Sequence, residues 1–105
     1  MRIQVFTSPS CSHGEAAVVM VKEYLTESGV VAEVEEVVTA NFEDAKNVRS
    51  LGSPTVRIDG VDIEYGTNEP QEFTSECRYY NTAEGWKPTP PGHLILGAIT
   101  RANKG

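Results

Sequence analysis

The sequence predicts an α/β fold with the element order β-α-β-α-β-β-α, arranged as a three-layer sandwich around a mixed four-stranded sheet. Short β-rich runs alternate with helical stretches in the first half of the chain, which indicates parallel strands joined by helices. Two strand-like runs then follow each other before a last amphipathic segment, which indicates antiparallel closing strands. A chain of 105 residues supports one core, so we expect a single domain over residues 1–105.

The first half of the chain opens with a strand and a helix. Residues 3–6 form a short β-rich run, and the polar segment 7–10 with its proline ends it. A helix is expected from about Glu15 to Ser28, with Gly29 as its stop signal. Its apolar stripe comprises Ala17, Val18, Val21, Tyr24 and Leu25.

A second strand and a second helix follow. Val30–Val38 reads as a strand with acidic residues typical of a sheet edge. Asn41 is placed to cap a short helix, which Gly52 is expected to end. Residues 55–58 predict a third strand, and Asp59-Gly60 predicts a turn after it.

The last third is less regular. Residues 62–75 form an acidic segment with Gly and Pro that fits no element, and Cys77–Tyr80 is expected to be the fourth strand. A proline-rich loop over 84–91 leads to a final helix from about Gly92 to Asn103.

Composition excludes several classes of function. The net charge of −6 argues against nucleic acid and anionic membranes as partners, because both require clustered Lys and Arg. No apolar run approaches the roughly 18 residues needed to span a bilayer. The N-terminal residues read as a strand and not as a signal peptide, so we expect a cytoplasmic location.

Cys11 is the candidate reactive residue. It lies between the first strand and the first helix, where the free amides and the positive end of the helix dipole favour thiolate over thiol. Cysteines so placed have pKa values lowered to roughly 3.5–7.5, and the thiolate is the nucleophile. A second signal is Ser53-Pro54-Thr55 at the start of the third strand, a position suited to a cis X–Pro bond.

With these motifs in this order, the chain resembles the thioredoxin/glutaredoxin superfamily. Cys77-Arg78-Tyr79-Tyr80 and the Gly85-Trp86 loop also look like a group of small bacterial thioredoxin-like proteins. The resemblance implies that Cys11 is the attacking thiol and that Pro54 is the cis-proline facing it. It also implies that Ser53, with Thr55 beside it, binds an extended substrate strand.

The chain departs from the superfamily's C-x-x-C motif, because Gly14 stands where the second cysteine would be. The sequence therefore predicts a single-cysteine (monothiol) cycle of thiol–disulfide exchange, in which an external thiol resolves the mixed disulfide. The expected partners are protein or low-molecular-weight thiols and disulfides, and we expect neither a cofactor nor a bound metal.

Other residues near the motif have more than one interpretation. His13 and Ser12 are candidate modulators of Cys11, although His13 is expected in solvent and Ser12 is better placed to cap the helix. Cys77 is the candidate second thiol. With a fourth strand antiparallel to the third, however, Cys77 lies too far from Cys11 for a direct disulfide unless segment 62–75 bends the register, and a buried core cysteine is favoured. Tyr79, Tyr80 and Trp86 either line a groove beside Pro54 or pack in the core.

Two other functions stay open. One is a redox-inactive module that keeps the groove at Pro54 to bind a peptide or a partner strand, with Gly14 marking the lost activity. The other is a soft-metal site on the Cys11 thiolate, which lacks a second ligand nearby.

Overall fold

The structure, a computed structural model, describes residues 1–104. Its elements alternate in the first half of the chain and become short strands in the second half. In chain order they are β1 (Arg2–Thr7), α1 (Gly14–Ser28), β2 (Glu33–Val38), α2 (Phe42–Val48), β3 (Leu51–Ser53), β4 (Thr55–Ile58), β5 (Val61–Asp62), β6 (Thr74–Cys77), β7 (Tyr80–Thr82), β8 (Gly85–Lys87) and α3 (Gly92–Lys104).

The central sheet has four strands in the order β2-β1-β4-β5. β1 is parallel to β2, with Arg2 opposite Glu33, and β4 is antiparallel to both β1 and β5. This mixed sheet and the three helices confirm the predicted fold class. The parallel pair results from the helical crossover α1, whereas the antiparallel pair β4–β5 needs only the two-residue turn Asp59-Gly60.

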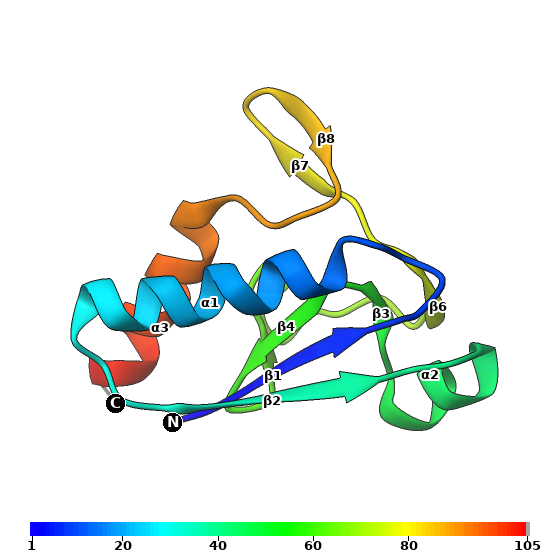
Figure 1. The fold of residues 1–105 in the computed structure, drawn as a ribbon, viewed down its shortest axis with the longest axis horizontal. Coiled ribbons are helices and arrows are strands. Elements are labelled where there is room, and N and C mark those ends of the chain that lie inside the picture. The colour runs from blue at the N-terminus through cyan, green and yellow to red at the C-terminus, as the bar shows by residue number, and fades with distance from the viewer. Residues whose placement is uncertain (105) are drawn as a thin grey trace.

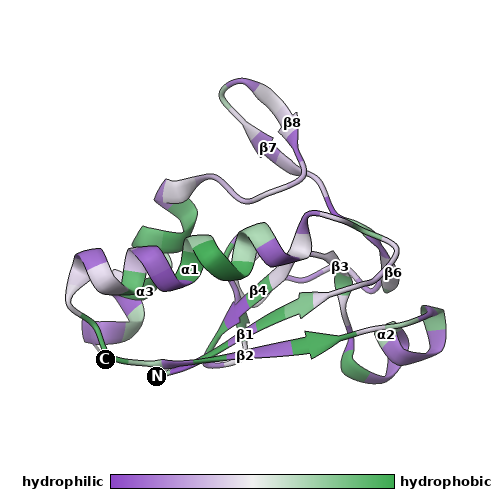
Figure 2. Ribbon diagram, viewed as in Figure 1, coloured by the Kyte–Doolittle hydropathy of each residue, from purple (hydrophilic) through white to green (hydrophobic). Residues whose placement is uncertain are grey.

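One face of the sheet and two helices enclose the hydrophobic core. α1 runs across the sheet with α3 beside it (Figure 1), and hydrophobic and hydrophilic segments alternate along α1 (Figure 2). The buried residues of α1 belong to the core. Full burial of one aliphatic side chain stabilises a fold by about 1.5–3 kcal/mol, which offsets the low helix propensity of the valines in α1. The buried core residues of the sheet and of these helices are Ile3, Val5, Val56, Ile58, Ala17, Val18, Val21, Leu25, Ile95, Ala98 and Ile99.

The short helix α2 lies beyond the end of β2, next to β6 (Figure 1). Asn41 caps it as predicted, because its side-chain oxygen accepts a 2.9 Å hydrogen bond from the Asp44 amide. The predicted end at Gly52 is wrong. The helix ends at Val48, and Arg49 closes it in the left-handed conformation with φ 60°.

The prediction of Cys77–Tyr80 as the fourth strand of the sheet is also wrong. β5 is the fourth strand, and residues 63–73 then form the segment that connects β5 to β6. Residues 74–77 form β6, which pairs in parallel with β3, away from the central sheet. Gly52 permits this pairing of β6 with β3. A side chain at Gly52 would come within 3.0 Å of the Glu76 carbonyl oxygen, so glycine is what lets β6 approach β3.

The predicted loop over 84–91 contains a strand. β7 and β8 form an antiparallel hairpin that projects from the rest of the molecule (Figure 1). The side chain of Trp86 in β8 is 67% exposed. Within the described residues, no helix is long and apolar enough to cross a membrane.

Candidate redox site

Cys11 lies in the turn that joins β1 to α1. Its amide donates a 3.1 Å hydrogen bond to the Ser8 carbonyl, and the Ser8 hydroxyl accepts one from the Ser10 amide at 3.2 Å. These bonds fold residues 8–11 into a compact turn and turn Cys11 inward, where it is only 6% exposed. Cys11 therefore lies between β1 and α1, as the sequence predicts, but its side chain is buried.

Cys11 and Cys77 form a disulfide, with their Cα atoms 5.2 Å apart. The expectation that Cys77 lies too far away and is an inert core cysteine is therefore wrong. That expectation assumed an antiparallel fourth strand, whereas β6 runs parallel to β3 and brings Cys77 directly opposite Ser53. Cys77 is half-buried and covers the sulfur of Cys11.

Ser53, Pro54 and Thr55 lie beside this disulfide, and the Ser53–Pro54 peptide bond is cis. Cys11 Sγ is 3.4 Å from the Ser53 carbonyl oxygen. The Ser53 hydroxyl accepts a 3.1 Å hydrogen bond from the Ser8 amide, which ties this segment to the Cys11 turn. Ser53 and Thr55 are both buried, and the Thr55 hydroxyl donates to the Gly52 carbonyl at 2.7 Å.

The backbone of Ser53 is already paired within the chain. Its carbonyl accepts a 2.8 Å hydrogen bond from the Arg78 amide, and its register partner in β6 is Cys77. The resemblance to the superfamily predicts this backbone to pair with an extended substrate, and that role stays a prediction. In this disulfide-bonded form, the chain's own strand β6 takes that place and presents its own cysteine to Cys11.

Gly14 shows why no second motif cysteine is present. A Cβ atom at this buried first residue of α1 would lie 2.7 Å from the Thr7 Cγ2 atom and 2.9 Å from the Ser53 hydroxyl. Separations this short do not occur between packed side chains, and both neighbours are themselves buried. The close approach of α1 to β1 and to the Ser53 segment therefore requires glycine, and the second thiol comes from β6.

Arg78, which sequence reasoning did not assign to the site, is buried directly after Cys77. Arg78 is 6% exposed, and its guanidinium donates to both carboxylate oxygens of Asp62, at 2.7 and 3.0 Å, and to Glu64 at 3.0 Å. Burial alone would raise the pKa of Asp62. The hydrogen bonds and positive charge of Arg78 outweigh that effect, so the pKa is lowered from its usual 3.8.

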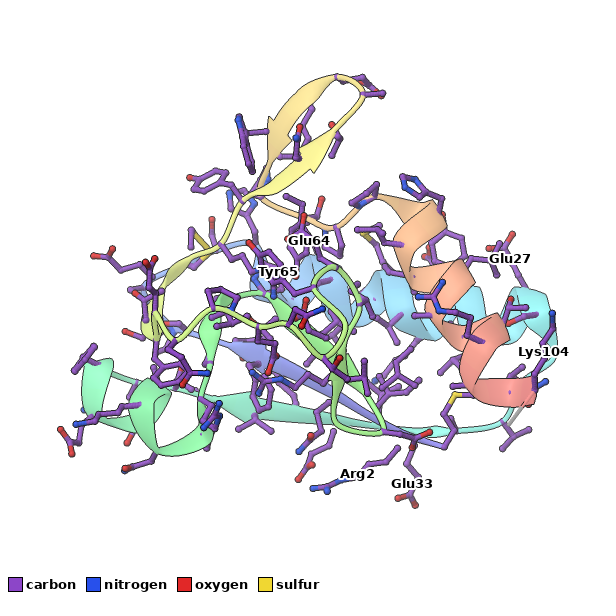
Figure 3. All side chains as sticks on the ribbon, turned by 180° about the vertical axis from the view of Figure 1, so that it is seen from behind. Arg2, Glu27, Glu33, Glu64, Tyr65 and Lys104 are labelled. Carbon is purple, nitrogen blue, oxygen red and sulfur yellow. A yellow bond between two sulfur atoms is a disulfide. The ribbon has the colours of Figure 1, made fainter. Side chains whose placement is uncertain are left out.

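Two aromatic rings complete the surroundings of Arg78. Tyr80 and Tyr65 stack against its guanidinium, with ring centres 4.4 and 5.1 Å away. Glu64 and Tyr65 come from the segment after β5 (Figure 3). Tyr80 is fully buried and its hydroxyl donates a 2.6 Å hydrogen bond to the Pro54 carbonyl. Burial raises the pKa of Tyr80, so it remains a neutral donor.

A spacing signal for this cluster was present in the sequence. Asp62 and Glu64 are two residues apart, and the turn that follows β5 brings both carboxylates to Arg78. Two carboxylates on one side require a cation if they are buried. In the structure that cation is Arg78, which follows Cys77 directly.

The remaining predicted residues contribute less. Ser12 is exposed and does not cap α1, because the capping position is His13. Within residues 1–104, the His13 side chain makes no capping hydrogen bond, and no hydrogen bond joins Cys11 Sγ to an amide of α1. Of the three aromatics proposed for a groove, Tyr80 packs under Pro54, whereas Tyr79 and Trp86 are exposed.

Comparison with known proteins agrees with this architecture. Residues 1–76 match the family model described as thioredoxin domain. Neither the curated proteins nor the solved structures gave a match. The match includes the Cys11 turn and the Ser53–Pro54 segment and stops one residue before Cys77. By this match over most of its length, together with its mixed sheet and the cysteine at the start of α1, the chain belongs to the thioredoxin-domain family.

Proposed function

We propose that this protein carries out thiol–disulfide exchange, with Cys11 as the attacking thiol and Cys77 as the thiol that resolves the mixed disulfide. The observation that supports this is the Cys11–Cys77 disulfide at the start of α1, next to the Ser53–Pro54 segment. The family's redox-type fold supports the same chemistry. A partner thiol within the chain favours a two-cysteine cycle over the single-cysteine cycle expected from the sequence.

The reducing half of the cycle has two exchanges. The Cys11 thiolate attacks one sulfur of a substrate disulfide, forms a Cys11–substrate mixed disulfide and releases the other substrate sulfur as a thiolate, which takes up a proton. The Cys77 thiolate then attacks Cys11 Sγ and releases the remaining substrate thiolate. The Cys11–Cys77 disulfide forms as the substrate disulfide is lost, so two electrons pass from the protein to the substrate.

Regeneration begins at Cys77. In the oxidised protein Cys77 is half-buried and Cys11 is buried, so an external thiolate reaches Cys77 Sγ more readily. Attack there expels the Cys11 thiolate at the start of α1, where the positive end of the helix dipole favours a negative charge. A second external thiol then releases Cys77 as a free thiol. The substrates we propose are low-molecular-weight or protein disulfides in the cytoplasm, where disulfides are mostly transient and catalytic.

The test is the reaction of the reduced protein with bis(2-hydroxyethyl) disulfide, a small neutral disulfide. We expect wild type to release two equivalents of mercaptoethanol per protein, whereas Cys77→Ser releases one and accumulates a mixed disulfide on Cys11, seen as added mass. We expect Cys11→Ser to react no faster than a free cysteine. A wild-type rate no greater than that of free cysteine at the same pH contradicts the proposal.

A second candidate follows from the occupied Ser53 backbone. The burial of Cys11 and the pairing of β6 with β3 also suit a disulfide that only locks the structure in a redox-inactive binding module. That function predicts slow, unselective exchange in wild type. It also predicts partner binding that survives in Cys11→Ser once a partner is known.

A further inference from the structure

The segment that carries Cys77 is held in place by contacts other than the disulfide. The Thr74 amide donates a 3.0 Å hydrogen bond to the Ser50 carbonyl at the start of β6, and the Arg78 amide donates to Ser53 at its end. Between them, the Ser75 carbonyl accepts a 3.1 Å hydrogen bond from the Ser10 hydroxyl of the Cys11 turn. None of these hydrogen bonds involves a sulfur atom.

The strongest of these contacts is the Arg78 side chain. It reaches from the residue after Cys77 into the body of the protein, where it meets Asp62 and Glu64, and its Nη1 lies 3.3 Å from the Thr55 hydroxyl. Asp62 is 1% exposed, so this is a desolvated, two-pronged pair with fixed geometry. The guanidinium therefore fixes the end of β6 relative to β4 and β5.

We propose that Arg78 is a positioning residue that holds the Cys77 thiol opposite Cys11 in the reduced protein. The proposal rests on the proposed redox role of Cys11 and Cys77. It adds that Arg78 sets the reduction potential of their disulfide. A disulfide between two thiols held together is favoured in proportion to their effective concentration. If Arg78 keeps Cys77 in place after reduction, the dithiol is a strong reductant. If Cys77 is released on reduction, the disulfide is easier to reduce.

The reaction to be measured is exchange with glutathione. One oxidised glutathione and the protein dithiol give the Cys11–Cys77 disulfide and two reduced glutathiones, so the electrons and protons balance. The equilibrium constant has units of concentration and reports the effective concentration directly. A tenfold fall corresponds to a shift of about 30 mV toward a less negative potential for this two-electron couple.

Arg57 provides a matched control. It is also a buried arginine, 6% exposed, with a 2.8 Å pair to Glu69 and its guanidinium stacked 4.8 Å from the Phe6 ring. Among the described residues, its other hydrogen bonds go to the carbonyls of Val48 and Arg49, and no partner belongs to β6. Arg57→Met therefore removes a buried ion pair that has no direct contact with β6.

The experiment equilibrates wild type, Arg78→Met, Asp62→Asn and Arg57→Met with glutathione buffers, followed by acid quench and counting of alkylated thiols by mass. Circular dichroism verifies that both redox forms are folded. We expect the equilibrium constant to fall at least tenfold in Arg78→Met and at least threefold in Asp62→Asn. Arg57→Met should stay within twofold, because a loss of stability shared by both redox forms cancels.

Each other outcome overturns the proposal. Unchanged constants in the Arg78 and Asp62 variants show that β6 stays in place without the pair. A shift in Arg78→Met alone shows an effect of the positive charge on the sulfurs, since Asp62→Asn retains that charge. Equal shifts in Arg57→Met show a general effect of destabilisation. If Arg78→Met does not fold, Asp62→Asn alone decides the outcome against Arg57→Met.

This test is independent of the proposed function. The equilibrium constant is measurable even if the protein reduces no substrate faster than free cysteine. In that case positioning by Arg78 stands and the exchange activity fails. If wild type exchanges disulfides rapidly but the equilibrium constants of the variants do not change, the proposed function stands and positioning by Arg78 fails.

Discussion

Reduction of the Cys11–Cys77 disulfide is expected to destabilise the fold. The size of this effect follows from the number of residues in the loop that the disulfide closes. The two cysteines are 66 positions apart, and the loop-entropy relation assigns such a cross-link about 4 kcal/mol. The effect acts on the unfolded state, because the cross-link restricts the open chain. At an m-value of about 2 kcal/mol per molar urea, the unfolding midpoint of the oxidised protein lies about 2 M higher than that of the reduced protein.

Urea unfolding followed by circular dichroism, with and without reductant, measures this difference. The oxidised protein should also show the smaller m-value, because a cross-linked unfolded chain exposes less surface. Cys77→Ala is the control. Its midpoint should match that of reduced wild type and should not respond to reductant. Coincident midpoints for oxidised and reduced wild type, in samples whose thiol content is verified, would refute the reasoning.

Three further predictions concern the surroundings of the disulfide. Gly14→Ala should lower stability by about 1–3 kcal/mol in thermal unfolding, since its methyl group meets the buried Thr7 side chain, and an unchanged melting temperature contradicts this packing. Tyr80→Phe should destabilise by about 1–3 kcal/mol in urea, because the cis-proline carbonyl loses its buried donor. Asp62→Asn should be less stable than wild type at pH 7. Because Arg78 lowers the folded-state pKa of Asp62 below 3.8, its contribution is complete at neutral pH and is lost as the pH falls through that lowered pKa. The stability gap measured in urea should therefore shrink at pH 3, and a gap that is constant with pH refutes this assignment.

The elements that the sequence predicts well are those with local signals. The run from Thr55 to Ile58 matches β4, and α1 begins within one residue of its expected start. Asn41 caps α2 through a bond to a residue three positions away, which is a local rule. These segments form their hydrogen bonds or their apolar faces within a few residues, so the pattern alone indicates them.

The site depended on a non-local pairing that leaves little trace in the sequence. β6 is the polar segment Thr74–Cys77, without the alternation that marks a strand, and it pairs with β3 more than twenty residues away. The sequence pattern predicts a helix stop at Gly52, whereas in the structure its missing side chain makes room for β6. The burial of Arg78 was equally hidden, because arginine is mostly exposed and becomes buried only when its partners are in place.

The disulfide also divides the chain topologically. Oxidation makes residues 11–77 a covalent ring and leaves two tails, and those tails carry β1 and α3. β1 is the strand between β2 and β4, so the middle of the sheet belongs to a tail while both of its neighbours belong to the ring. The cross-link alone therefore cannot assemble the core. In the oxidised protein, the native fold exists only once both tails have docked onto the ring.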